Sequence, residues 1–287
     1  MRSLLSARGS AATNALVVLA VIVWNYWTTV NGFRGRTVGG MSDAYRTLFT
    51  PASYAFSIWG LIFLGLVVNA GYQLWLAFSA RAEQADSESA IGRHRATYFA
   101  RLGPWLIATN LANGLWVVLW LSEQTAASVI VLSAMFVFLN MAMRRLDMET
   151  WDAPLEVIAL VWWPIVTYAG WVTVAVLANL SAFLAKHGVV RGDSVGWAIA
   201  MISVATVVNL ALVWRRNLRE HALVAIWALV AVAVRNAEGA SSVRWSALGA
   251  AMLLGVAVLF HALEHWRTLP FLRGVAGSKT DESSSGG

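Results

Sequence analysis

Eight stretches of this 287-residue chain carry no formal charge, and they follow one another from near the N-terminus almost to the C-terminus. A helix needs about 20 apolar residues to cross a bilayer, so the first six stretches are long enough and the last two are shorter. Hydrophobic residues make up 59% of the chain and charged residues 13%, which is too apolar for one soluble domain. We expect an all-α, polytopic transmembrane helix bundle of about eight helices, over residues 12–33, 51–80, 102–122, 124–143, 157–185, 194–214, 222–234 and 245–260.

The composition also excludes several kinds of chemistry. The chain has no cysteine, so disulfides, thiolate catalysis, iron–sulfur clusters and cysteine zinc sites are excluded. Its net charge of +6 comes from basic residues in short clusters between apolar stretches, and these clusters form no continuous basic face. Such clusters are typical of membrane topology signals, so we expect no nucleic-acid partner.

The distribution of Lys and Arg residues predicts the orientation in the membrane. If the N-terminus is cytoplasmic, segments on the cytoplasmic side hold fourteen of these residues and loops on the other side hold seven. Because cytoplasmic loops are enriched in basic residues, this bias places both termini in the cytoplasm, in agreement with an even number of helices. The first stretch is long and lacks a small-residue cleavage site, so it is not a signal peptide. We expect a protein of the bacterial inner membrane.

Aromatic residues gather at the start of the second stretch, which reads TPASYAFSIWGLIF. On a helix, Trp59 and Phe63 are four residues apart and Phe56 precedes Trp59 by three, so these three share a face. Pro51 fits the first turn of such a helix, where a missing N–H costs nothing. Together with Tyr54, these residues form either an aromatic belt at the membrane interface or one wall of a ligand site.

Two asparagines and two tryptophans line one side of the third stretch, LIATNLANGLWVVLW. Asn110 and Asn113 are three residues apart, and Trp116 and Trp120 continue the same stripe. Since an amide that faces lipid is costly, both asparagines should point into the bundle. They either join helices through hydrogen bonds or contact a ligand, and polar tips beside flat apolar walls are typical of a small-molecule site.

A third cluster lies in the fifth stretch, VWWPIVTYAGWVTVAVLANLSAFL. Pro164 removes a backbone hydrogen bond, which predicts a kink. Gly170 and Ala178 offer small surfaces for close contact between helices, and packing alone would explain them. One stripe of this helix carries aromatic, small and amide side chains, namely Tyr168, Trp171, Ala175 and Asn179.

In order and spacing, the three clusters resemble the TspO/MBR proteins, the tryptophan-rich sensory proteins whose mammalian member is the translocator protein. TPASYAFSIWGLIF is similar to the start of the family's second helix, ANGLW to the Leu-Asn-x-x-Trp motif of its third, and TYAGWVTVAVLAN to the Pro-Tyr-x-x-Trp-Val motif of its fifth. The chain departs from the pattern at Thr50, Tyr54, Phe63 and Thr167, where the family has Pro, Trp, Tyr and Pro. The resemblance covers residues 10–187, so the remaining residues mark a long form with extra C-terminal helices.

The resemblance implies a five-helix bundle around a pocket that binds porphyrins, sterols or drug-like aromatics, closed by the loop between the first two helices. The pocket contacts that it implies are Trp59, Phe63, Asn110, Asn113 and Trp171. Indole faces stack on flat rings and amides meet polar edges, so the neighbouring aromatic and amide positions extend this set. The candidate ligand-binding residues are Tyr54, Phe56, Trp59, Phe63, Asn110, Asn113, Trp116, Tyr168, Trp171 and Asn179.

These inferences give a predicted organisation. Residues 1–189 form a TspO-like five-helix membrane core, residues 190–266 a three-helix C-terminal membrane extension, and residues 267–287 a cytoplasmic polar tail. We expect a sensor or binding protein and no enzyme, with no required cofactor and no metal, and with porphyrin or haem as a candidate ligand. Its partners would be membrane lipid and a hydrophobic small molecule, and a homodimer is left open.

Two other functions are alternatives. The sequence HALEH, from His261 to His265, matches the H-x-x-E-H pattern of a zinc protease with Glu264 as base, but its place at the end of the last stretch favours a polar helix end at the membrane surface. A small-molecule membrane transporter is the second alternative. No acidic or basic residue lies in the middle of a stretch, so ion coupling lacks its usual residue. Intramembrane amides would line its path, namely Asn25, Asn69, Gln73, Asn110, Asn140, Asn179 and Asn209.

Overall fold

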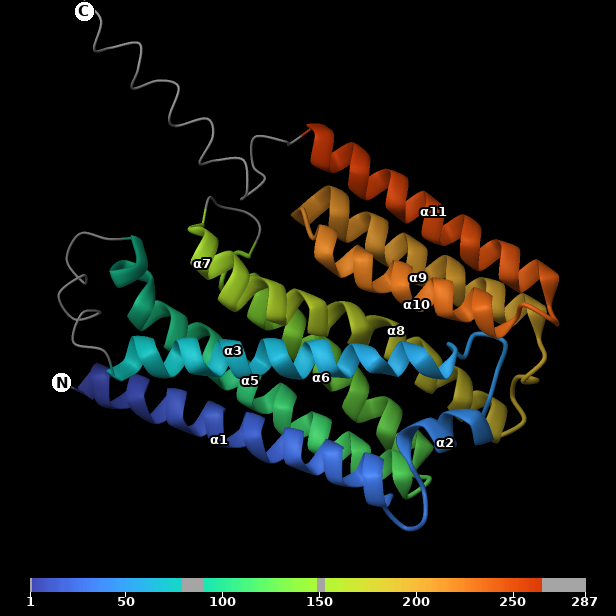
Figure 1. Cartoon of the computed structure of the whole chain (residues 1–287), viewed down its shortest axis with the longest axis horizontal. Helices are drawn as coiled ribbons and strands as arrows, with labels where there is room; N and C mark the ends of the chain where they lie inside the picture. Colours follow the sequence, from blue (N-terminus) through green and yellow to red (C-terminus); the bar gives the residue numbers. More distant parts are fainter. Residues whose placement is uncertain (1, 79–89, 149–152, 265–287) are drawn as a thin grey trace, which may run out of the picture.

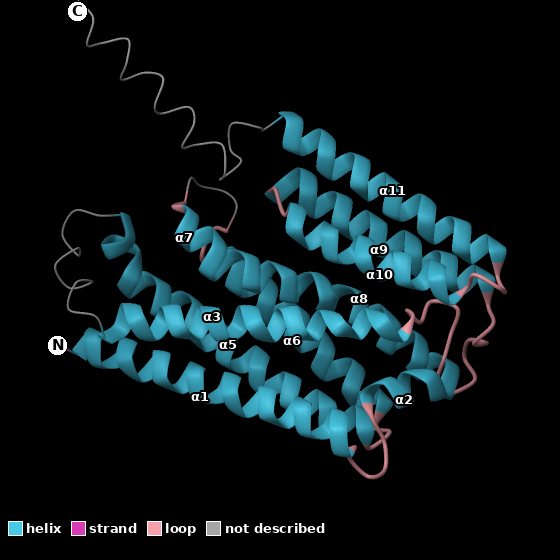
Figure 2. Cartoon of the chain, viewed as in Figure 1, coloured by secondary structure: helices cyan, strands magenta, loops and turns pink. Residues whose placement is uncertain are grey.

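The computed structural model describes residues 2–78, 90–148 and 153–264, and this part of the chain is almost entirely helical (Figure 1, Figure 2). The long helices run side by side. The predicted all-α bundle of about eight helices is confirmed. Its helices are α1 (Arg2–Asn31), α3 (Ile58–Phe78), α5 (Ala90–Leu121), α6 (Thr125–Arg145), α8 (Trp163–Lys186), α9 (Val195–Arg216), α10 (Arg219–Arg235) and α11 (Ser241–Glu264).

Five of these helices form a closed ring. Going round it, α1 packs against α3, α3 against α8, α8 against α6, α6 against α5, and α5 against α1. The other three helices lie outside the ring, where α10 packs against α8 and also contacts α9 and α11. The helices therefore fall into the two groups that the sequence suggests, but the domain boundaries stay a prediction, and the predicted tail, residues 267–287, lies outside the described residues.

The described helices have the length and composition of membrane spans. Seven of them are long and apolar enough to cross a membrane. The exception, α10, has 17 residues and is about 26 Å long, somewhat less than the hydrocarbon core of about 30 Å. It still runs from one end of the bundle to the other between α8, α9 and α11, so α1 begins and α11 ends at the same end (Figure 1). The protein is an integral membrane protein.

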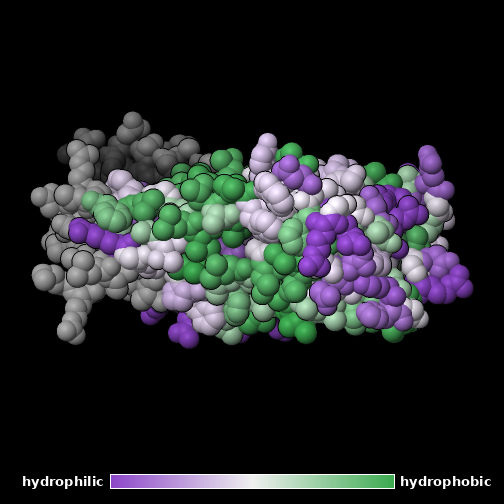
Figure 3. Space-filling model, turned by 90° about the horizontal axis from the view of Figure 1, so that it is seen from below, coloured by the Kyte–Doolittle hydropathy of each residue, from purple (hydrophilic) through white to green (hydrophobic). Residues whose placement is uncertain are grey.

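The surface and interior of the bundle are arranged as lipid requires. Seen from the side of α1, hydrophobic residues gather in the middle of the molecule and hydrophilic ones near the end that carries α2 (Figure 3). On α3, Leu61 and Leu64 are exposed, whereas Asn69 and Gln73 are buried. The Gln73 amide donates to Asn69 Oδ1 over 2.8 Å, and the Asn69 amide donates to the Leu160 carbonyl over 2.9 Å. The bond to Leu160 joins α3 to the segment before α8, and both bonds spare polar groups from contact with lipid.

The helix before Pro164 changes its hydrogen-bond pattern, as the proline predicts. A short α7 (Leu155–Val157) leads into the π-helix η3 (Ile158–Trp162), and α8 begins at Trp163. A π-helical segment is one of the usual causes of a bend in a long helix. The carbonyl that receives the Asn69 amide belongs to this segment, so the contact between α3 and α8 lies where the helix is irregular.

The start of the second stretch differs from the prediction. Residues Ser53–Ser57 form the 3-10 helix η1, and α3 begins only at Ile58. Pro51 lies before η1 in non-helical backbone, so its expected place in the first helical turn is wrong. The physical reason is a contact distant in sequence, because the Ala52 amide donates a hydrogen bond to the Ala231 carbonyl on α10 over 3.0 Å.

The connection between α1 and α3, residues 32–52, covers one end of the ring, and we call it the lid (Figure 1). Gly32 and Gly35 have φ angles of +72° and +74°, a backbone conformation that glycine adopts readily and that permits tight turns. The lid also contains a short helix that the sequence did not predict, α2 (Val38–Ala44). The Thr37 hydroxyl begins this helix by accepting a hydrogen bond from the Gly40 amide over 3.1 Å.

Candidate functional site

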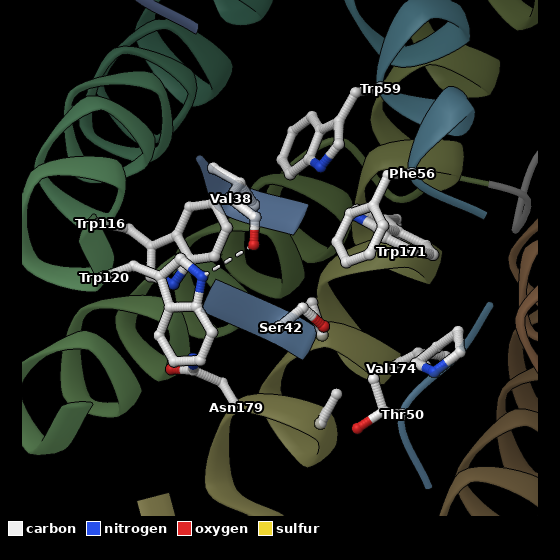
Figure 4. Close-up of a pocket in the computed structure, with 13 residues that line it drawn as sticks. Val38, Ser42, Thr50, Phe56, Trp59, Trp116, Trp120, Trp171, Val174 and Asn179 are labelled. Carbon is white, nitrogen blue, oxygen red and sulfur yellow. Dashed lines mark hydrogen bonds between the residues drawn. The ribbon is translucent and has the colours of Figure 1, made fainter. Parts of the chain in front are cut away.

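Beneath the lid lies a small inner cavity of about 50 Å³. Figure 4 shows Trp116 and Trp120 on one side of it and Phe56, Trp59 and Trp171 on the other. The lid, η1, α3, α5 and α8 all contribute to the lining. Its walls are mainly aromatic and apolar, and its polar groups are Ser42, Thr50 and Asn179.

A larger outer cavity of about 470 Å³ lies beside the inner one. Its wall on α1 carries polar side chains, Asn25 and Thr29, together with Tyr26. The lid, η1, the start of α3 and Trp116 on α5 complete the lining. This volume falls within the range of about 300–1,000 Å³ that is usual for small-molecule sites, whereas the inner cavity is far below it.

The two cavities share one partition. Four residues line both of them, Val38, Phe56, Trp59 and Trp116. The Trp59 ring stacks on the Phe63 ring with centroids 5.3 Å apart. The Trp116 ring lies nearly parallel to the Trp59 ring, with centroids 6.4 Å apart. Because side-chain rotation at this partition would join the two spaces, they can act as a single site with aromatic walls.

The lid is fixed to α5 directly above the partition. The Trp120 indole N–H donates a hydrogen bond to the Val38 carbonyl over 3.3 Å (Figure 4). A tryptophan that lines the inner cavity therefore also holds α2 of the lid. Displacement of the Trp120 ring would break this hydrogen bond between α5 and the lid.

An ionic cluster, which we call the latch, closes the outer edge of the lid. Its centre is Glu123, in the turn between α5 and α6, which forms an ion pair with Arg36 of the lid. The Tyr45 hydroxyl of the lid donates to Glu123 Oε2 over 2.9 Å, and the Lys186 ammonium at the end of α8 donates to the Glu123 carbonyl over 2.7 Å. The hydrogen bond from Tyr45, with the charges of Arg36 and Lys186, lowers the pKa of the Glu123 carboxyl from its usual 4.5. The latch is therefore charged at neutral pH.

The C-terminal helices hold the other side of the lid. Asp43 of α2 forms an ion pair with Arg235 at the end of α10. The Asn236 amide donates to the Leu48 carbonyl over 2.9 Å, and the Leu48 amide donates to the Gly192 carbonyl over 3.0 Å. The extension therefore contributes to the closed position of the lid, a connection that no sequence motif indicates.

Six of the ten predicted site residues line the cavities. Five of the six line the inner cavity. Three of these five, together with Phe63, line the outer cavity. The Phe56 and Trp171 rings meet edge to face, with centroids 5.9 Å apart. The structure thus brings together residues of η1, α3, α5 and α8, as the motifs predict, namely Phe56, Trp59, Phe63, Trp116, Trp171 and Asn179.

Two more predicted residues lie behind this wall. Tyr168 is fully buried, and its ring meets the edge of Trp59 with centroids 5.8 Å apart. Asn113 is also fully buried and accepts a hydrogen bond from the Asn25 amide over 2.9 Å. Both residues therefore support Trp59 and Asn25, which line the outer cavity, and neither lines a cavity itself.

The remaining two predicted residues are not brought to the site. Tyr54 is 39% exposed, and its ring meets the edge of Trp227 on α10 with centroids 5.2 Å apart. The 3-10 geometry of η1 accounts for this, because its residues do not follow the helical spacing on which the prediction relied. Asn110 is fully buried without lining either cavity, and its amide has no hydrogen-bond partner among the described residues. Direct ligand contact by Tyr54 or Asn110 stays a prediction, and the position of both residues outside the two cavities does not favour it.

Sequence reasoning named Asn25 only as an amide along a transport path, and it missed the rest of the wall on α1 and the inner surface of the lid. Asn25 and Thr29 are polar residues one helical turn apart in a membrane-spanning helix, and this spacing was the signal that could have identified them. For Val38 and Ser42 no such signal exists, because their position depends on how the lid folds over the ring. Trp120, which the sequence places on the stripe of α5, does line the inner cavity.

The HALEH pattern is only partly visible. His261 is buried in α11, and its ring meets the edge of Trp214 on α9 with centroids 5.7 Å apart. His265 lies outside the described residues. Among the described residues, no group of three or more His, Asp or Glu side chains is arranged to hold a metal ion. What the structure describes of this segment is packing between two helices of the extension.

Comparison with known proteins identifies a family for this chain. Neither the curated proteins nor the solved structures include one that matches this chain. The family described as "TSPO-like protein" matches residues 11–260. This range includes the five-helix ring, the lid and nearly all of the three C-terminal helices. The chain therefore belongs to the TSPO-like protein family.

Proposed function

We propose that this protein is a membrane sensor that binds a flat hydrophobic molecule, a porphyrin or another tetrapyrrole, or a sterol, beneath its lid. The observation that carries this proposal is the shared aromatic partition, in which Phe56, Trp59 and Trp116 line both cavities. Aromatic rings offer a large apolar area in a fixed orientation and stack on flat ligands. Asn25 and Thr29 on one side and Asn179 on the other provide hydrogen bonds for polar edges.

The volumes of the two cavities support the outer cavity as the place where the ligand first binds. The inner cavity of about 50 Å³ has no room for such a molecule, whereas the outer cavity of about 470 Å³ does. The ligand therefore occupies the outer cavity and reaches Trp171 and Asn179 only when the partition moves. The Trp120 ring holds the lid through the Val38 carbonyl, so movement of the partition loosens the lid. The ion pair between Asp43 and Arg235 then transmits the change in the lid to α10. This chain of contacts makes a sensor a better description than a passive binder.

The experiment that tests the proposal is tryptophan-fluorescence quenching of the purified protein by protoporphyrin, haem and a sterol. We expect saturable quenching by one class, and an affinity that falls in Trp59→Leu. The matched control is Trp245→Leu, since Trp245 is 64% exposed on α11 and lines neither cavity. Quenching by none of the three classes, or equal affinity in both variants, would overturn the proposal and leave transport as the better interpretation.

We also propose that the protein lies in a bacterial inner membrane with both termini in the cytoplasm. The support is the distribution of fourteen and seven basic residues between the two sides. In this orientation the lid and latch face the periplasm, so a ligand would reach the outer cavity from that side of the membrane.

A further inference from the structure

A second and larger hollow lies on the lipid-facing side of the bundle, between α3, α8 and α10, and we call it the groove. Its volume is about 810 Å³. None of its lining residues lines the inner or the outer cavity, so it is a separate feature of the molecule. Because α10 forms one wall, the groove exists only where the extension meets the five-helix ring.

The floor of the groove is a close contact between α3 and α8. A Cβ atom on Gly65 would lie 3.2 Å from the Pro164 Cβ, so the two backbones approach each other there. The walls are apolar, with Leu61 and Leu64 on α3 and Leu223 on α10. All three leucines are at least half exposed, as expected for side chains that face hydrocarbon.

The length of the groove matches one leaflet of a bilayer. Its lining on α3 extends from Ile58 to Val68, a distance of about 15 Å along the helix, which is about half of the hydrocarbon thickness of about 30 Å. The hollow is therefore long enough for one acyl chain of a lipid.

One end of the groove carries a carboxylate. Glu220, in the first turn of α10, lines the groove, and its buried Oε2 has no hydrogen-bond partner among the described residues. A buried carboxylate oxygen without a hydrogen-bond donor lowers the stability of the protein. A cationic donor forms the strongest hydrogen bond with such an oxygen. Arg215, in the last turn of α9, and Arg219, the first residue of α10, carry positive charges at the same turn that suit a phosphate. The end of the groove thus offers both charges that an amine-bearing phospholipid needs.

We propose that the groove is a specific site for phosphatidylethanolamine. One acyl chain lies along α3 and α8, the ammonium group donates to Glu220, and the phosphate faces the arginines of the α9–α10 turn. A choline head group carries the same charge but cannot donate a hydrogen bond, and a glycerol head group carries no positive charge. Both should bind more weakly for these reasons. This site is independent of the ligand proposed beneath the lid.

Native mass spectrometry of the full chain tests the proposal, with phosphatidylethanolamine, phosphatidylcholine and phosphatidylglycerol added to the delipidated protein. We expect about one retained phosphatidylethanolamine per chain, and a loss of about tenfold or more in Glu220→Gln, the effect of one charge-assisted hydrogen bond. Glu238→Gln is the matched control, since Glu238 is exposed in the turn before α11. Leu223→Trp, which fills the groove, should abolish retention, whereas Leu259→Trp on the exposed face of α11 should not.

Three results would overturn the proposal. Equal retention of the three lipids would mean that the groove holds ordinary boundary lipid. Unchanged retention of phosphatidylethanolamine in Glu220→Gln would remove the carboxylate from recognition, and displacement of the lipid by a simple long-chain amine would make the amine, and not the phospholipid, the ligand. If Leu223→Trp does not fold, the pair Glu220→Gln and Glu238→Gln decides the question.

Discussion

The indole rings of Trp59 and Trp116 lie nearly parallel, 6.4 Å apart, and each of them borders both cavities beneath the lid. They come from helices that do not adjoin in the ring, since α3 packs against α1 and α8 whereas α5 packs against α1 and α6. The pair therefore closes the space between two opposite parts of the bundle. Movement of either ring changes the volume that a ligand can use.

The first prediction concerns Trp59. In Trp59→Leu an apolar side chain remains, but the stacking surface is lost, and such a contact contributes about 0.5–1.5 kcal/mol, or roughly two- to tenfold in affinity. Fluorescence titration with protoporphyrin measures this loss through the fifteen tryptophans that remain of the sixteen. The thermal stability of Trp59→Leu should stay close to that of Trp245→Leu. A variant that binds normally but unfolds earlier would show that Trp59 serves packing and not ligand binding.

The second prediction concerns the latch and its dependence on pH. The pKa of the Glu123 carboxyl is lowered in the closed state. The latch therefore stabilises the closed lid fully at pH values above the usual carboxyl pKa of 4.5, and this stabilisation is lost as the pH falls through the lowered pKa. Glu123→Gln should open the lid at neutral pH, because Arg36 and Lys186 then lack their anionic partner. Hydrogen exchange of residues 32–52 reports the opening, with Glu238→Gln as control. Equal protection of the lid in wild type and Glu123→Gln would exclude a role of the latch in closure.

A third prediction concerns a buried polar cluster between α8, α9 and α10. His221 is fully buried, with its Nδ1 2.7 Å from Asn209 Oδ1 and its Nε2 3.1 Å from the Thr173 hydroxyl. Thr173→Val keeps the shape but removes this partner of the imidazole, which should lower the free energy of unfolding by about 1 kcal/mol. Thr206→Val is the control, since the Thr206 hydroxyl donates to Ile202 within its own helix. Thermal unfolding in detergent compares the two, and equal midpoints would contradict the prediction.

The fourth prediction is the topology. The described helices place the beginning of α1 and the end of α11 at the same end of the bundle, and the basic residues assign that end to the cytoplasm. The test uses a reporter protein that is active only in the cytoplasm. This reporter should be active when it is fused after Gly287 or inserted in the α9–α10 turn. A reporter inserted in the lid should be inactive. Activity in the lid and none at Gly287 would reverse the orientation.

The sequence predicts the helices and much of the site because both depend on local spacing. Trp116 lies on the predicted stripe of α5 and Trp171 on that of α8, and the structure places both at the inner cavity. Tyr54 does not follow, because a hydrogen bond from Ala52 to Ala231 delays the start of α3 and leaves Tyr54 in a 3-10 turn. Contacts between distant segments also decide the position of the lid. No pattern within residues 32–52 indicates that Arg36 pairs with Glu123.

The last prediction concerns Gly170, which the sequence marks as a small surface for close packing. A Cβ atom there would lie 2.9 Å from the His221 carbonyl oxygen and 2.9 Å from the Val224 Cβ, so α8 and α10 approach each other at this glycine, as predicted. The carbonyl belongs to backbone and cannot move aside as a flexible side chain would. Gly170→Ala must therefore push α10 away from the ring and weaken the contacts around His221.

We expect Gly170→Ala to lower the free energy of unfolding by about 1–3 kcal/mol, as overpacking of a tight interface does. Gly249→Ala on α11 is the matched control, because nothing lies within 4 Å of its added Cβ, and alanine in a helix is more stable than glycine by up to about 1 kcal/mol. The two alanine substitutions should thus change stability in opposite directions. Thermal unfolding measures both, and hydrogen exchange in α10 locates the effect. If Gly170→Ala were as stable as Gly249→Ala, the close approach of α8 and α10 would not be what fixes the C-terminal helices on the ring.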